Sequence, residues 1–174
     1  AQAFGSGTHP TTQTCLLALA EQRKKKRPPR RILDMGCGSA ILAMAAQRLF
    51  PAANIFAVDN DPVSVRTAQE NRQKNQISVM KMRAIVSEGF GDRVVSRNGP
   101  YDLIMANILA GPLRRMAAEL SHNLCSGGQL ILSGLLYNQV QQIVGDYRAR
   151  KLTLEMRLTQ DNWCCLVFKK RQKG

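Results

Sequence analysis

The sequence is short of acidic residues. It has 12 Asp and Glu against 25 Lys and Arg, which gives a formal net charge of +13 over 174 residues. Much of the excess lies in two tracts that contain no acidic residue, Arg23 to Arg31 and Lys169 to Lys173. A field of this sign attracts anions such as RNA. Two interpretations stay open: a solvated linker, broken by Pro28 and Pro29, with a frayed tail, or a contact with RNA.

The sequence also lacks paired cysteines and long apolar runs. Its five cysteines are odd in number and include no C-x-x-C pair, which argues against a disulfide framework and a zinc site. Apolar runs such as Ile41 to Ala46 are too short to cross a bilayer, and no secretory signal is visible. We therefore expect no metal, a cytoplasmic location, and free buried thiols. These thiols are Cys15, Cys37, Cys125, Cys164 and Cys165.

The length and the pattern of apolar residues predict one α/β domain. A chain of 174 residues can bury one core but is short for two full domains. After Pro29, short apolar strands alternate with helical stretches, which is typical of a doubly wound, mostly parallel sheet with crossover helices. The expected strands are Arg31 to Met35, Ile55 to Asp59, Ile77 to Val86, Tyr101 to Ala106 and Gln129 to Ser133.

Apolar residues spaced by three and four positions predict the helices. One long helix is expected from Leu113 to Leu124, and Gly127 and Gly128 end this element before the next strand. Two further strands, Leu152 to Thr159 and Trp163 to Lys169, predict a closing antiparallel hairpin. The other expected helices are Ile41 to Leu49, a helix capped by Asp61 that runs to about Lys74, and Val140 to Tyr147.

A glycine-rich loop, DMGCGSA, joins the first expected strand to its helix. A dinucleotide-binding loop would have its third small residue at position 41, where this chain has Ile, so the spacing disfavours NAD. Gly36 and Gly38 lack the Cβ that would collide with a closely bound ligand. Asp59, at the end of the second strand, can accept hydrogen bonds from both ribose hydroxyls of a nucleoside. Together with Asp34, which precedes the loop, these residues form the expected cofactor cradle.

Four motifs resemble one family of enzymes. An acidic residue before a loop with small residues at alternate positions is typical of methyltransferases. Phe4 to Thr12 (FGSGTHPTT), ILDMGCGSA, AVDNDP and Ala106 to Pro112 (ANILAGP) are similar to the methyltransferases of the large-subunit ribosomal protein L11. The resemblance spans nearly the whole chain and includes Asn162 to Cys164 near its end. It implies S-adenosylmethionine as the cofactor and a lysine or N-terminal amine of a ribosomal protein as the methyl acceptor.

The resemblance also implies a set of roles and one absence. Residues 1–174 correspond to the catalytic domain, and the small N-terminal domain with which this family grips its substrate is not expected in the chain. Two positions depart mildly from the family: Ser6 stands where Thr is usual, and Ala40 where Gly is usual. The cofactor contacts implied by the resemblance are Thr12, Gly36, Asp59 and Asn107.

Two polar residues are candidates for catalysis. The sulfonium of the cofactor is an activated electrophile, so the enzyme mainly has to align a nucleophile and exclude water. Asn107 follows the fourth strand, where its amide carbonyl can hold an amine; its alternative role is to cap the turn before Gly111. His9 can relay a proton near neutral pH, or it can form hydrogen bonds within its own loop.

Two other functions stay open at the level of the residues. A nucleic-acid adenine methyltransferase would share the fold and fit the basic charge. Such enzymes place a Pro-Pro-aromatic run after the Asn to stack the flipped base, whereas Ile108 to Ala110 stands here. A non-catalytic RNA-binding module would need a basic face but no cofactor. Binding of S-adenosylmethionine separates this module from an enzyme.

Overall fold

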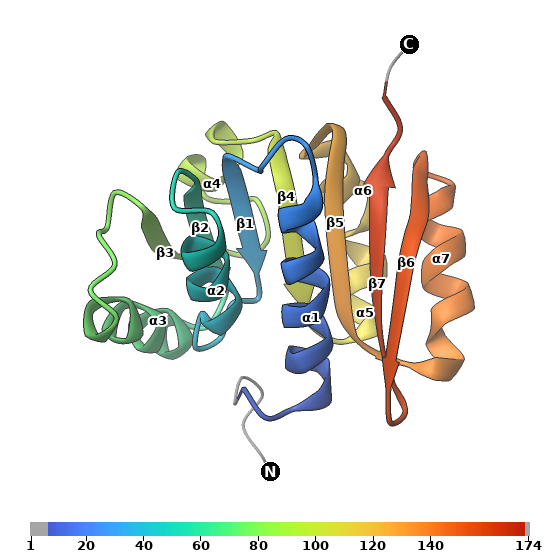
Figure 1. The fold of residues 1–174 in the computed structure, drawn as a ribbon, viewed down its shortest axis with the longest axis horizontal. Helices are drawn as coiled ribbons and strands as arrows, with labels where there is room; N and C mark the ends of the chain where they lie inside the picture. The colour runs from blue at the N-terminus through green and yellow to red at the C-terminus, as the bar shows by residue number, and fades with distance from the viewer. Residues whose placement is uncertain (1–6, 173–174) are drawn as a thin grey trace.

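The protein, described over residues 7–172 in a computed structural model, is built on one seven-stranded sheet (Figure 1). The strands are β1 (Arg31–Met35), β2 (Asn54–Asp59), β3 (Met82–Val86), β4 (Tyr101–Asn107), β5 (Leu124–Leu136), β6 (Leu152–Gln160) and β7 (Trp163–Lys170). They lie in the order β3-β2-β1-β4-β5-β7-β6. Strands β1 to β5 are parallel, and β7 is antiparallel to β5 and β6. The predicted doubly wound α/β class with a closing hairpin is confirmed.

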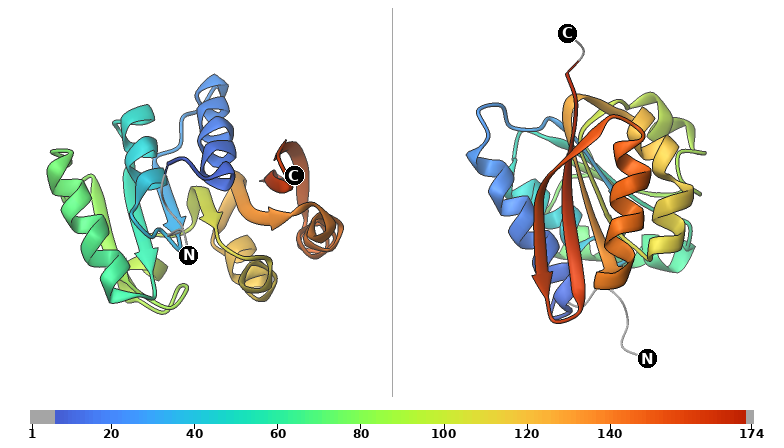
Figure 2. Two further views of the ribbon diagram at one scale, coloured as in Figure 1. Left: turned by 90° about the horizontal axis from the view of Figure 1, so that it is seen from below. Right: turned by 90° about the vertical axis from the view of Figure 1, so that its right-hand side faces the viewer.

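Helices cover both faces of the sheet (Figure 2). They are α1 (Pro10–Glu21), α2 (Ile41–Leu49), α3 (Pro62–Lys74), α4 (Arg93–Arg97), α5 (Ala110–Arg115), α6 (Ala117–His122) and α7 (Val140–Arg148), with short 3₁₀ turns η1 (Gln22–Lys24) and η2 (Tyr137–Gln139). One hydrophobic cluster joins the sheet to α1, α2 and α3, and a second joins it to α4 through α7. The inner parallel strands β1, β2, β4 and β5 are therefore largely buried on both faces, whereas the edge strand β3 is partly exposed.

Helix α1 comes first in the chain but packs on the last strands of the sheet, β5 and β7. Two polar contacts fasten it there. The Ser133 hydroxyl donates to the carbonyl oxygen of Thr11 at 3.2 Å, and the Gln160 amide donates to the Gln13 side-chain oxygen at 2.6 Å. The first turn of α1 thus lies beside the ends of β4 and β5. The start of the FGSGTHPTT motif, including the Ser6 departure, lies outside the described residues.

The third strand is shorter than the sequence predicted. Ile77 to Val86 is predicted as one strand, but β3 begins only at Met82. Before it, the Ile77 amide donates to the Arg72 carbonyl at 3.0 Å, and the Met82 amide donates to the Ser78 carbonyl at 3.0 Å. Ile77 is buried at the end of α3, which explains an apolar residue at a position outside the strand. The residues that follow it form a turn.

The predicted helix from Leu113 to Leu124 is also corrected. It is two short helices, α5 and α6, separated at Met116, where φ is −84° and ψ is 0°. Leu124 already belongs to β5. Gly127 and Gly128 do not end an element, because β5 runs through them. Gly127 has a φ of +77°, and the pairing of β5 with β4 shifts register close by, so these glycines form an irregularity within a strand.

Other features agree with the sequence. Asp61 caps α3 by accepting hydrogen bonds from the backbone amides of Val63 at 3.0 Å and Ser64 at 3.1 Å, and these bonds lower the pKa of its carboxyl. All five cysteines are free. Four are buried as expected, whereas Cys125 is half-buried, so the prediction was wrong for this thiol. No helix within residues 7–172 has the length and apolar character needed to span a membrane.

Two glycines enclose the residue that follows β4. An ideal Cβ on Gly134 of β5 would lie 2.3 Å from the backbone oxygen of Ile108, and one on Gly36 would lie 2.3 Å from Ile108 Cγ2. Both glycines have left-handed backbones, with φ of +81° and +72° respectively. Ile108 is therefore held between the ends of β1 and β5, and no larger residue fits at either glycine without displacing it.

We expect Gly134→Ala to destabilise the protein by about 2 to 5 kcal/mol, from the left-handed backbone and the steric overlap together. Gly145→Ala is the matched control. A Cβ there meets nothing within 4 Å, and Gly145 lies inside α7 on the protein surface. This control should raise stability by about 0.5 to 1 kcal/mol. Urea unfolding of both variants measures the difference. Equal stability of Gly134→Ala and Gly145→Ala would mean that Ile108 can move away from a Cβ at position 134 at little cost.

Candidate active site

A pocket of about 930 Å³ opens at the carboxyl end of the parallel strands. Here β1 and β4 are neighbours and the chain continues outward from them in opposite directions, which is where doubly wound sheets bind ligands. His9 does not line this pocket. The residues that do line it include all six expected cofactor contacts, Thr12, Asp34, Gly36, Gly38, Asp59 and Asn107.

The glycine loop after β1 is tied to the end of β2 by backbone hydrogen bonds. The amides of Gly36 and Cys37 both donate to the Val58 carbonyl, at 2.7 and 2.9 Å. The Gly38 amide donates to the Asp59 carboxylate at 2.9 Å. These bonds require left-handed backbones at both glycines, with φ of +72° and +52°. Sequence and geometry therefore agree that the loop curves back on itself beneath an open space.

The Asp59 carboxylate already accepts two hydrogen bonds from backbone amides of the protein. Its Oδ2 accepts from the Gly38 amide, and its Oδ1 accepts from the Asp61 amide at 3.0 Å. A carboxylate has about four lone-pair positions, so each oxygen retains one for a further donor. Asp59 is only half-buried and faces the pocket. It can thus brace the loop and accept hydrogen bonds from two ribose hydroxyls at the same time.

Asp34 supplies the cap that α2 does not provide for itself. Ala40, the N-cap residue, has a left-handed φ of 62° and no side-chain oxygen. Instead, Asp34 Oδ2 accepts from the Ala43 amide at 3.0 Å, which satisfies one of the free amides of the first turn. Burial raises the pKa of Asp34 to about 7; the Ala43 amide lowers it, and the charge of Asp59 raises it further. Asp34 therefore titrates close to neutral pH.

Asn107 stands at the end of β4, facing the first turn of α1. Its Nδ2 donates to the hydroxyl oxygens of Thr11 at 3.3 Å and Thr12 at 3.5 Å. These bonds orient the amide, and its Oδ1 is buried with no hydrogen-bond partner within residues 7–172. A buried acceptor without a donor costs about 1 to 3 kcal/mol, so it is an unusual feature of a folded protein. The carbonyl is free to receive a donor from a ligand.

His9 caps α1 at the edge of this region. Its Nδ1 accepts from the Thr11 amide at 3.3 Å and shares a 2.7 Å hydrogen bond with the Thr11 hydroxyl. The ring also packs edge-on against Trp163, with centroids 5.4 Å apart. The alternative role given to His9, hydrogen bonding within its own segment, is confirmed. Its role as a proton relay stays a prediction.

Sequence reasoning missed three residues that build the site. Ile108 and Gly134 fix the segment beside Asn107, but the motif pattern singled out only the absence of an aromatic side chain there. Ser87, directly after β3, is buried and lines the pocket; its hydroxyl donates to the Gly89 carbonyl at 3.1 Å. Its position one residue past a strand was the available signal. Glu88, the next residue, also lines the pocket and is exposed.

Known structures and sequences place this geometry in a class and a family. The sheet order, the glycine loop and the acid ending β2 define the fold of class I S-adenosylmethionine-dependent methyltransferases. An O-methyltransferase of Thermotoga maritima shares this fold, with a TM-score of 0.75, 15% identity, and coverage of 96% of this chain and 68% of the other. The model of the family "Ribosomal protein L11 methyltransferase (PrmA)" matches residues 2–171. The chain belongs to this family.

Individual relatives carry the name of the same family. The ribosomal protein L11 methyltransferase of Bradyrhizobium diazoefficiens is 42% identical over 170 residues, which are 98% of this chain and 57% of the relative. That of Rhizobium meliloti is 41% identical and covers 93% and 55%. A solved ribosomal protein L11 methylase from Lactobacillus delbrueckii subsp. bulgaricus has a TM-score of 0.81 at 30% identity, covering 96% of this chain and 82% of the other. The chain spans little more than half the length of the curated relatives.

Titration of Asp34 should make the stability of the protein depend on pH. Its pKa is about 7 when folded and near ~3.9 in an unfolded chain, so the folded state binds more protons between these values. The free energy of unfolding should therefore fall as pH rises through this window and then level off. Asp34→Asn keeps an acceptor for the Ala43 amide but removes the titration.

Urea unfolding from about pH 5 to about pH 8 tests this expectation. The decline should be smaller in Asp34→Asn, and the variant should gain on the parent as pH approaches neutrality. Parallel pH profiles for the two proteins would assign the decline to other groups.

Proposed function

We propose that this chain is the catalytic domain of a methyltransferase that moves methyl groups from S-adenosylmethionine to amines of a ribosomal protein, with L11 as the substrate. The observation that carries the proposal is the buried Asn107 carbonyl, which has no donor within the described residues and belongs to a residue that lines the pocket. The amine is a lysine side chain or an N-terminus. Family membership and the name of the relatives support the choice of substrate.

The residues present suit S-adenosylmethionine. The left-handed backbones of Gly36 and Gly38 keep the loop flat beneath the pocket, and Asp59 has lone pairs left for ribose hydroxyls. Asp34 accepts a hydrogen bond from the Ala43 amide and so holds the start of α2, which follows the loop. Thr12 lines the side formed by α1. We propose these five residues, with Asn107, as the cofactor-binding set.

The cofactor, when bound, supplies a methyl group on a sulfonium, which needs no further activation. The protein's part is to align an amine with that methyl and to exclude water. Asn107 Oδ1 can accept a hydrogen bond from the amine, while Thr11 and Thr12 keep the amide from rotating. Covalent catalysis is not required. Burial strongly raises the pKa of the Cys37 thiol in the pocket, so this group stays protonated and unreactive.

An acceptor lysine must lose its proton before attack, because its amine has a reference pKa near ~10.4. A poorly solvated pocket favours the neutral amine by destabilising the charged form. We propose that His9 assists through α1: it caps the turn that carries Thr11 and Thr12 and so positions Asn107. A direct proton relay through His9 would need a path to the pocket that the ligand completes.

A nucleic-acid base is the weaker acceptor. Enzymes that methylate a flipped base need an aromatic side chain to stack on it, and the residue after Asn107 is Ile108, wedged between two glycines. Ile108 cannot turn outward to replace such a side chain. The RNA contact expected at Arg23 to Arg31 lies at the opposite end of the sheet and is compatible with methyl transfer to protein. We place this activity in the cytoplasm, where ribosomal proteins are made.

Asp59→Ala should weaken S-adenosylmethionine binding, because it removes the acceptors of two ribose hydroxyls and the brace of the loop. The expected loss is about 1 to 3 kcal/mol of binding free energy. Asp61→Ala is the control, since Asp61 caps α3 without an oxygen in the pocket. Calorimetric titration measures both. Unchanged affinity in Asp59→Ala would remove Asp59 from the cofactor site, and an absence of any binding by the parent would favour a non-catalytic module.

Asn107→Ala should lower the rate of methyl transfer by roughly 10²-fold or more, while the affinity for the cofactor changes much less. Ser133→Ala is the control: it loses another hydrogen bond to the first turn of α1 but leaves the Asn107 carbonyl in place. Single-turnover transfer of labelled methyl to ribosomal protein L11, at saturating cofactor, separates the two effects. A full rate in Asn107→Ala would exclude the carbonyl from catalysis, and label in RNA alone would overturn the protein substrate.

A further inference from the structure

A second pocket, of about 490 Å³, lies at the amino end of the parallel strands, the end away from the cofactor cradle. It is formed by the basic tract after α1 and by residues of β4, β5 and β7. In Figure 1 this tract lies at the upper end of the sheet. The length of β1, roughly 15 Å, separates it from the glycine loop. Its lining includes four cations, Lys25, Lys26, Arg27 and Lys169.

The one carboxylate that lines this pocket is already engaged. Asp102 Oδ2 accepts from the backbone amides of Arg30 at 2.9 Å and Arg31 at 2.8 Å, and its Oδ1 accepts from the Cys125 thiol at 3.5 Å. Asp102 thus fixes the end of the basic tract to the sheet. Within residues 7–172, neither Lys26 nor Arg27 forms an ion pair. Their charges remain available to a ligand.

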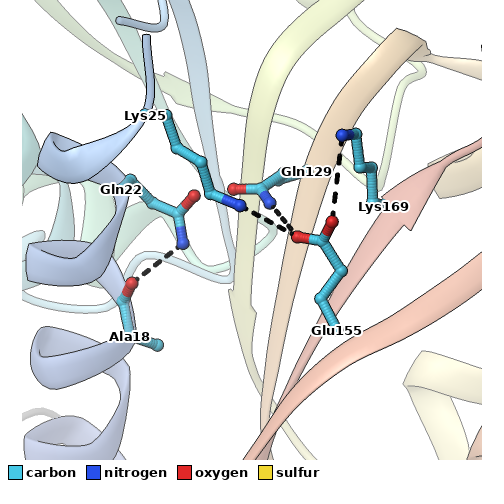
Figure 3. Close-up of polar contacts among 6 residues, drawn as sticks. All are labelled: Ala18, Gln22, Lys25, Gln129, Glu155 and Lys169. Atoms are coloured by element: carbon cyan, nitrogen blue, oxygen red, sulfur yellow. Dashed lines mark hydrogen bonds and ion pairs between the residues drawn. The ribbon is translucent and has the colours of Figure 1, made fainter.

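Glu155 of β6 holds the two sides of the pocket together (Figure 3). Its carboxylate binds the Lys25 ammonium at 3.1 Å and the Lys169 ammonium at 3.8 Å, and it accepts a hydrogen bond from the buried Gln129 amide. One negative charge is therefore shared by two positive ones. The tract that the sequence left open as a solvated linker is largely exposed, but Lys25 and the backbone amides of Arg30 and Arg31 tie it to the sheet.

The basic charge of the whole chain is concentrated at this end. Thirteen of the 25 Lys and Arg lie in residues 22–31, 148–153 and 169–172, which contain no Asp or Glu. Three carboxylates bind these segments, those of Glu21, Asp102 and Glu155, so the excess of positive charge at this end is at most ten of the formal +13. The three segments are neighbours in space: the Arg171 amide donates to the Lys151 carbonyl at 3.3 Å, and Glu155 joins Lys25 to Lys169.

The same segments lack the features that protein partners, membranes or unpaired bases would need for binding. None of the exposed large hydrophobic residues lies in them, so they lack the apolar anchors on which protein interfaces and membrane insertion depend. They also have no exposed aromatic side chain for stacking unpaired bases. What they offer is closely spaced ammonium and guanidinium groups, which suit the regularly spaced phosphates of a nucleic-acid backbone.

We propose that this end of the sheet binds the phosphate backbone of folded RNA, with one phosphate in the pocket at Lys26, Arg27 and Lys169 and its neighbours along the flanking basic segments. This site is distinct from the cradle and goes beyond the proposed methyl transfer, on which it does not depend. We expect it to recognise backbone and shape, since its basic segments have no exposed aromatic side chain on which a base could stack. The protein would thus hold RNA at one end while its other end carries out chemistry.

The test uses fluorescence anisotropy of a labelled RNA hairpin, titrated with the protein over a series of salt concentrations. Lys26→Gln combined with Arg27→Gln should weaken binding on the order of tenfold and reduce the salt slope by about two, because two phosphate contacts are lost. The matched control is Arg66→Gln combined with Lys74→Gln, two exposed cations on α3. It removes the same charge elsewhere and should leave the slope unchanged.

A third variant moves affinity in the other direction. Glu155→Gln keeps an oxygen for Lys25 and Gln129 but frees two ammonium groups from the carboxylate, so RNA affinity should rise several-fold. Thermal unfolding checks that each variant is folded. Equal losses in the two double variants would reduce the effect to overall charge and overturn the site. So would lower affinity in a folded Glu155→Gln, or displacement of RNA by polyglutamate as effectively as by unlabelled RNA.

Discussion

The backbone around Ile108 passes so close to its neighbours that the rest of the site depends on it. Gly36 follows β1 and Gly134 lies in β5, and each leaves out a side chain that Ile108 would otherwise meet at 2.3 Å. This contact fixes the direction in which the chain leaves β4, and hence where Asn107 points. The glycine loop and the Asn107 amide are consequently parts of one contact, although they come from separate motifs in the sequence.

Polar groups extend this contact outward in two directions. On one side, Asp59 ties the glycine loop to β2 while it retains lone pairs for a ligand. On the other, Thr11 and Thr12 bind the Asn107 amide and turn its carbonyl into a buried, unpartnered acceptor. Both arrangements leave hydrogen-bonding capacity unused in the protein itself. That unused capacity, which folding alone would not favour, marks the pocket as a place built for a ligand.

The strand-to-helix alternation and the cradle could be predicted because they depend on short-range patterns. Asp34, Gly36, Gly38 and Asp59 all follow from where apolar strands end. The predictions of secondary structure were wrong where the residue type at a position is explained by contacts with a distant part of the chain. Gly127 reads as a helix terminator but lies at an irregularity in β5, and Ile77 reads as strand because it is buried by α3. Gly134 gave no signal at all, since its role depends on a residue from another strand.

The placement of α1 has a consequence for how the protein folds during its synthesis. Its contacts to Ser133 and Gln160 join residues 122 and 147 positions apart, so the strands it packs on leave the ribosome long after α1 does. Until then the first turn of α1 has no surface on which to dock, and the Asn107 amide has no threonines to hold it. Such long-range contacts form late in folding. A nascent chain can build β1 to β4 before these contacts exist, but the pocket is complete only after β5 and the β6–β7 hairpin have emerged.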